Sequence, residues 1–139
     1  MRIPYGVTGA ELHRDISGAE NLDSQSGTLK AEDSEDELVR KAMAAPIGSP
    51  RLSELARGKK TATIIVSDHT RPVPSKHILP FMLAELREGN PDIDITLLIA
   101  TGFHRATTRE ELAAKVGEGL ASREKFVCHD SRGASSNVE

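Results

Sequence analysis

The chain has 139 residues, a net charge of -3 and 37% hydrophobic residues, with 3% aromatic residues and no tryptophan. This length suffices for one domain whose core is built from aliphatic side chains. No block of Lys and Arg marks a nucleic-acid partner, and no apolar run approaches the roughly 20 residues of a membrane span. With a single cysteine and no secretory signal at its start, the sequence predicts a soluble cytoplasmic protein.

The first 30 residues are polar and contain glycine and serine. Weak alternation at Ile3–Tyr5 and Glu11–His13 is compatible with short edge strands, and residues 22–30 are typical of a loop. We therefore treat residues 1–30 as a polar N-terminal segment and residues 31–139 as an α/β domain.

Two helices are predicted at the start of this domain. Ser34 with Glu37 three residues later forms a capping-box pattern, and apolar residues follow at helical spacing before Gly48. Ser49 before a proline is typical of an N-cap and first helical position, and Gly58 is a natural end.

The central and C-terminal parts alternate between strands and helices. Residues 61–66 are β-branched and nearly continuous in apolar character, which favours a strand buried on both faces of a parallel sheet. Further strands are predicted at residues 93–100 and 125–128. A helix capped by Ser75 separates the first two strands, and a helix with a capping box at Thr107 and Glu110 separates the last two.

This order predicts a Rossmann-like parallel sheet layer with flanking helices, joined by right-handed crossovers. Three parallel strands leave an open sheet edge, and the polar tail at residues 131–139 adds no closing element. We therefore expect the α/β domain to be incomplete at its C-terminal end.

Polar side chains follow the first two predicted strands, where open parallel sheets bind ligands. They are Asp68, His69, Thr70 and Arg71 after the first strand, and Thr101, Gly102, His104 and Arg105 after the second. If the two strands are neighbours, the loops start about 5 Å apart and form one constellation.

Each of these residue types has a matching chemistry. The planar guanidinium of Arg71 suits a carboxylate, and His104 suits a general base near neutral pH. Gly102 allows the backbone to turn sharply beside a ligand, and Thr101 adds a donor for an anion. Structural alternatives stand beside these roles, because an aspartate such as Asp68 often caps a turn and pairs with a nearby surface arginine.

The remaining sequence patterns give weaker evidence of function than these two loops. Cys128 and His129 suggest a metal pair, but no further ligands accompany them, so we assign Cys128 to the core and predict no metal site. No Walker A, G-x-G-x-x-G or G-x-S-x-G pattern is present, which makes a Rossmann-like nucleotide binder a weak alternative.

The two loops, residues 67–75 and 100–105, resemble the paired signatures of the nickel-dependent lactate racemase family. Residues 46–49, 55–59 and 128–131 are also similar to it. The resemblance covers roughly residues 35–139, and the N-terminal residues match only loosely.

The resemblance implies an isomerase that acts on 2-hydroxy acids with a nickel pincer nucleotide, which is derived from nicotinic acid and tethered to a lysine. A histidine base would take the hydroxyl proton while the cofactor accepts a hydride from the α-carbon, and the hydride would return to either face of the keto acid. By this resemblance His104 is one of two proton-transferring histidines, and Arg71 holds the substrate carboxylate. The residues that would shape the two loops are Asp68, Thr70, Thr101 and Gly102.

The family's second catalytic histidine, cofactor-bearing lysine and nickel-binding histidine lie in segments beyond those matched here. We therefore expect this chain alone neither to retain nickel nor to racemise lactate. Its expected partners are a small 2-hydroxy acid and the remainder of a parent enzyme. A stand-alone anion-binding α/β module without catalysis is the alternative.

Overall fold

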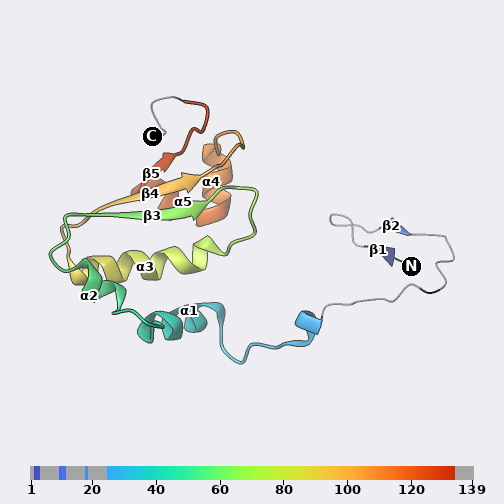
Figure 1. Cartoon of the computed structure of the whole chain (residues 1–139), viewed down its shortest axis with the longest axis horizontal. Helices are drawn as coiled ribbons and strands as arrows, with labels where there is room; N and C mark the ends of the chain where they lie inside the picture. The colour runs from blue at the N-terminus through green and yellow to red at the C-terminus, as the bar shows by residue number, and fades with distance from the viewer. Residues whose placement is uncertain (1, 4–9, 12–17, 19–24, 134–139) are drawn as a thin grey trace. The chain divides into compact units, whose positions relative to one another are not determined.

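The computed structural model of the chain describes residues 2–3, 10–11, 18 and 25–133 (Figure 1). The chain divides into two units, residues 1–32 and 33–139.

The first unit contains a pair of short antiparallel strands, β1 (Arg2–Ile3) and β2 (Ala10–Glu11). Each shares one residue, Ile3 or Glu11, with a predicted edge strand, and the other residues of those predicted strands lie outside the described part of the chain. A 3-10 helix, Gln25–Thr28, occupies part of the segment predicted as a loop.

The second unit is an α/β domain. Its elements are α1 (Glu35–Ala44), α2 (Leu52–Ala56), β3 (Thr61–Ser67), α3 (Ser75–Gly89), β4 (Asp94–Ala100), α4 (Arg109–Val116), α5 (Glu118–Arg123) and β5 (Lys125–Cys128). The strands form a parallel sheet in the order β3-β4-β5, which confirms the predicted parallel α/β layer with flanking helices. Helix α5 was not predicted, because Gly117, with φ of 89°, ends α4 and α5 restarts directly after it.

Several predicted helix starts are displaced by a residue or two. The Ser34 hydroxyl accepts a hydrogen bond from the Glu37 N–H at 3.3 Å, as predicted. By contrast, α2 begins after Arg51, because the Ser49 hydroxyl donates to the neighbouring Pro50 carbonyl instead of capping.

The observed starts of α3 and α4 also differ from the predicted ones. Ser75 is the first residue of α3 and does not cap it through its side chain. The capping box of α4 uses Thr108 and Glu111, one residue beyond the predicted pair, because the Thr107 hydroxyl contacts His69 instead.

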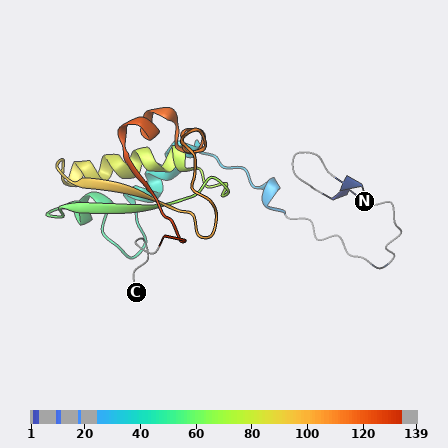
Figure 2. The ribbon, with the colours of Figure 1, turned by 90° about the horizontal axis from the view of Figure 1, so that it is seen from above.

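The burial of the strands corrects one prediction. In β3, Ile64 and Val66 are buried, whereas Ile65 between them is 72% exposed. Helices α3, α4 and α5 lie on the same side of the strands (Figure 2). Only one face of the sheet is therefore covered by described residues, and β3 is not buried on both faces. The buried cluster contains Ala56, Ile64, Val66, Leu79, Leu83, Leu86, Ile93, Ile95, Leu97, Ile99, Leu112, Val116, Leu120 and Ala121.

Candidate functional site

The carboxyl ends of β3 and β4 lie side by side. The register pairs Ser67 with Ala100, the last residue of each strand, so the two polar loops leave the sheet next to each other. This confirms the geometric premise on which the predicted constellation depends.

Asp68 is the centre of the cluster that these loops form. Its side chain is only 2% exposed. Oδ1 accepts hydrogen bonds from the Thr70 hydroxyl at 2.7 Å and from the Thr70 N–H at 3.1 Å, while Oδ2 lies 2.5 Å from Nδ1 of His104. These bonds, first the Thr70 hydroxyl and then His104, lower the pKa of the Asp68 carboxyl to about 2. Asp68 is therefore a buried carboxylate at neutral pH. It also caps the turn through the Thr70 N–H, as the structural alternative expected, but it does so in the interior and not at the surface.

His104 is oriented by this carboxylate. Its side chain is 47% exposed, so it borders both the buried aspartate and solvent. A carboxylate can only accept, so Nδ1 carries the proton of the short contact, and a neutral imidazole then has its lone pair on Nε2. This is the arrangement that suits a side chain to take a proton from a ligand.

Thr101 and Gly102 shape the second loop. Thr101 is buried, and its hydroxyl donates to the His129 carbonyl at 2.7 Å, which ties the loop to the end of β5. The His104 N–H donates to the Thr101 carbonyl at 3.0 Å, closing a turn in which Gly102 has φ of 56°. A residue with a side chain rarely adopts that φ, so glycine permits the turn that brings His104 back to Asp68.

Arg71 lies apart from the Asp68 cluster. Its backbone N–H donates to the Asp68 carbonyl at 3.3 Å, but its exposed guanidinium has no hydrogen-bond or ion-pair partner among the described residues. The side chain borders a hollow of about 470 Å³ between the β3 loop and α4, which Lys115 also lines. The Lys115 ammonium donates to the Arg71 carbonyl at 2.8 Å and holds the loop. The structural alternative, in which Arg71 pairs with Asp68 at the surface, is therefore not observed, and the exposed guanidinium is accessible to an anion.

A second cluster forms beside the first. Arg105 makes a two-pronged ion pair with Glu111, and His69 contacts the Thr107 hydroxyl at 3.1 Å. The pKa of Glu111 falls to about 2, mainly because of the Arg105 guanidinium. These contacts explain why the eight loop residues do not form one constellation: Arg105 and His69 face α4 instead of Asp68.

Two residues of the site region were not predicted from the sequence. Glu111 is recognisable as the third residue of a helix with a capping box, but not as the partner of Arg105. Lys115 occupies an ordinary position in α4, and no local pattern marks its contact with a loop 44 residues away. Both lie on α4 and contact the β3 loop, Lys115 at the Arg71 carbonyl and Glu111 at His69.

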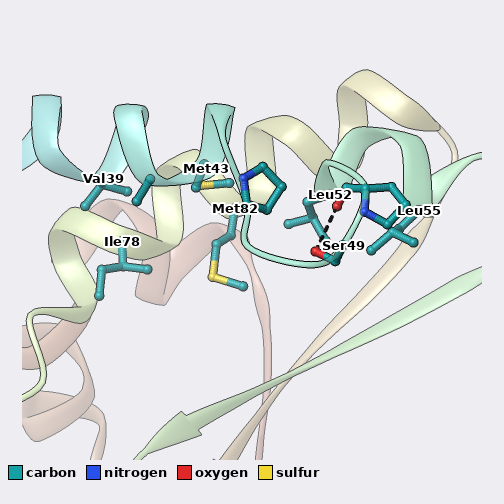
Figure 3. Close-up of a pocket in the computed structure, with 10 residues that line it drawn as sticks. Val39, Met43, Ser49, Leu52, Leu55, Ile78 and Met82 are labelled. Carbon is teal, nitrogen blue, oxygen red and sulfur yellow. Dashed lines mark hydrogen bonds between the residues drawn. The ribbon is translucent and has the colours of Figure 1, made fainter.

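A different hollow, of about 420 Å³, lies between α1, α2 and α3 (Figure 3). Its lining is almost wholly apolar, with Val39, Met43, Leu52 and Met82 among its residues, and its one hydroxyl, Ser49, is bonded to a neighbouring carbonyl. It contains no charged group to hold an anion, so it is not a candidate site for a carboxylic acid.

Neither a metal centre nor a membrane segment appears in the described part of the chain. No group of three or more His, Cys, Asp and Glu side chains is placed to hold a metal ion. None of its helices has both the length and the apolar character that crossing a membrane requires.

Comparison with known proteins decides the family. Residues 11–139 match the family model described as the lactate racemase N-terminal domain. The chain belongs to this family. The match confirms the resemblance of the two loops and extends it to residues 11–34, which matched only loosely by motif.

Two curated lactate racemases are similar to the chain along most of its length. The protein of Thermoanaerobacterium thermosaccharolyticum is 52% identical over 142 residues and covers the whole chain. The protein of Lactiplantibacillus plantarum is 50% identical over 125 residues, or 90% of the chain. The chain spans only 33% and 30% of these two relatives.

Solved structures agree on the fold. The structure of the lactate racemase apoprotein from T. thermosaccharolyticum matches 96% of the chain and 31% of its own length, with a TM-score of 0.80 and 44% identity. A Thermotoga maritima protein matches 72% of the chain and 22% of its own length, with a TM-score of 0.53 and 23% identity, and shares the fold alone.

Proposed function

We propose that this chain supplies part of the active site of a 2-hydroxy-acid racemase or epimerase of the lactate type. The family supports the reaction class, since both curated relatives are lactate racemases. The observation that carries the proposal within this chain is the contact of 2.5 Å between Asp68 and His104 at the carboxyl ends of two parallel strands.

His104 is the proposed base. Racemisation of a 2-hydroxy acid through a keto acid requires removal of the hydroxyl proton, and an imidazole with a free Nε2 lone pair can accept it. The Asp68 carboxylate holds the Nδ1–H and would stabilise the imidazolium that forms, as in other carboxylate–histidine pairs. Asp68 and Thr70 are thus positioning residues that act through His104.

Arg71 is the proposed binder of the substrate carboxylate. A guanidinium presents two parallel N–H donors that match the two carboxylate oxygens. Thr101 and Gly102 would support the opposite side of the site by fixing the turn that carries His104.

The nickel pincer nucleotide implied by the family resemblance would serve as the hydride acceptor when bound. The described residues of this chain do not fit it, because they contain no group of three potential metal ligands. The ligands and the tethering lysine would belong to other parts of a complete enzyme, whose curated relatives are about three times as long as this chain.

A stand-alone anion-binding module remains the second candidate, favoured by one observation. The Arg71 guanidinium is exposed and has no partner among the described residues, and an arginine in that state can bind a carboxylate without any catalysis.

Titration of the isolated chain with lactate tests the carboxylate role. We expect NMR shifts of the His104 side chain, abolished by Arg71→Ala and kept by Arg57→Ala, which removes another exposed arginine. Equal shifts with acetate would favour the simple anion-binding module, because acetate lacks the hydroxyl that His104 would contact. Unchanged lactate binding by Arg71→Ala would remove the proposed role.

A further inference from the structure

One face of the parallel sheet carries a row of apolar side chains that no described helix covers. The register places Ile65 beside Leu98, and Leu98 beside Val127, one from each strand. Ile65 is 72% exposed, Val127 is 43% exposed and Leu98 is partly buried. Parallel sheets are almost always covered on both faces, so this row is unusual for a finished surface.

The free edge of β3 is the second unpartnered feature. Strand β3 pairs only with β4 among the described residues, so its other edge offers unpaired backbone groups. A hollow of about 310 Å³ runs beside this edge, lined by β3 side chains and by Ile78 and Met82 of α3. The Ser67 hydroxyl lies buried at the end of this strand without a hydrogen-bond partner in the described structure. An added strand would use both the backbone groups and the apolar hollow.

Connection handedness links the two features. The crossovers from β3 to β4 and from β4 to β5 step in one direction, so right-handed connections place their helices on one face. To reach a strand added at the free edge of β3, the chain would step across the sheet in the opposite direction. A right-handed connection of that kind places its helix on the opposite face, where Ile65, Leu98 and Val127 lie. One added strand and its connecting helix would therefore pair with the free edge and cover the open face together.

We propose that the free β3 edge and the Ile65–Leu98–Val127 row form a docking surface for the remainder of a lactate racemase chain, which adds a parallel strand beside β3 and a helix over the row. The length of the relatives supports this occupant, since about two-thirds of each lies outside the region that this chain matches. The added strand would place the Asp68 loop at the point where the strand order reverses, the position at which open α/β sheets bind ligands.

A second copy of this chain fits the surface less well. A two-fold axis that joins two β3 edges pairs them antiparallel and continues the sheet, which leaves both apolar rows uncovered. An axis that stacks the two rows face to face leaves both edges open. A single second copy therefore satisfies only one of the two features.

Cysteine labelling tests this docking surface. The isolated chain is compared with a chimera in which it replaces the matched third of the T. thermosaccharolyticum lactate racemase. Single variants Ile65→Cys and Val127→Cys are labelled with a maleimide, and each site is followed by peptide mass spectrometry. The matched control is Ile47→Cys, because Ile47 is also an exposed isoleucine but lies in the loop between α1 and α2.

We expect both face variants to be labelled rapidly in the isolated chain and about tenfold or more slowly in the chimera, because labelling then requires local opening. The control should be labelled at the same rate in both. Equal labelling of Ile65→Cys and Val127→Cys in chain and chimera would overturn the proposal. Protection in the isolated chain that grows with its concentration would also overturn it, by assigning the row to a second copy. Racemisation of lactate by the same chimera is recorded separately, so protection without activity would leave this surface supported and count against the proposed catalytic roles.

Discussion

At the scale of single residues, Asp68 combines burial with charge. A carboxylate that is almost fully buried costs free energy unless its oxygens are hydrogen-bonded, and here Thr70 and His104 satisfy both oxygens. The same bonds that stabilise the ion also fix the imidazole of His104. Stability and the proposed chemistry therefore depend on one side chain.

Asp68→Asn should destabilise the chain by about 1–3 kcal/mol at pH 7, since the amide cannot replace an ionised acceptor for both partners. The folded pKa of Asp68, about 2, lies below the ordinary value of 3.8, so its charge stabilises the fold at neutral pH. This stabilisation is complete above about pH 5 and is lost as the pH falls toward 2. Urea unfolding of both proteins at several pH values measures the difference.

The matched control is Asp92→Asn, at an exposed aspartate before β4. It should change the free energy of unfolding by less than about 0.5 kcal/mol at every pH. A difference between the parent chain and Asp68→Asn that stays constant from pH 7 to pH 3 would show that the carboxylate charge does not contribute.

At the scale of elements, the packing of α2 on α3 depends on a glycine. A Cβ on Gly89 would lie 2.0 Å from the Ser53 carbonyl oxygen and 2.9 Å from the Ala56 Cβ. Nothing in the local sequence marks Gly89 as a contact between helices, because local patterns contain no information on the helix that crosses it. Its role in the close approach of two helices becomes visible only in the structure.

Gly89→Ala should therefore lower the free energy of unfolding by about 1–3 kcal/mol, since backbone atoms must move apart to admit the methyl group. Gly119→Ala in α5 is the matched control, because a Cβ there meets nothing within 4 Å. That variant should be neutral or slightly stabilising. Thermal or urea unfolding measures both, and equal stabilities of the two variants would contradict this packing.

The elements themselves were largely predictable from the sequence. The β-branched runs identify β3 and β4, and the residues of β5 were predicted without error, because apolar periodicity and flanking glycines are local signals. Helix starts were less accurate, since Ser49 and Thr107 have the right chemistry for a cap but use their hydroxyls elsewhere. The exposure of Ile65 could not be foreseen, because an apolar residue does not reveal which part of a protein covers it.

At the scale of the whole molecule, the sheet explains how much of the candidate site was predictable. The rule that ligands bind at the carboxyl ends of parallel strands directed attention to the loops of Asp68 and His104, and these two side chains do contact each other. The rule could not indicate which residues of those loops contact Asp68 and which contact α4. Arg105 turns to Glu111 on α4, and Lys115 of α4 holds the Arg71 carbonyl; both contacts are set by the tertiary structure.

The most direct test of the proposed active site is lactate racemisation by the chimera with the T. thermosaccharolyticum enzyme. The chimera should racemise lactate, and His104→Ala should lower its rate by about 100- to 10,000-fold, the usual loss on removing a general base. His77→Ala is the control, because His77 pairs with Glu35 and Asp36 on α1, and that variant should keep the rate. Racemisation by the His104→Ala chimera at the parent rate would contradict the role of His104 as the base.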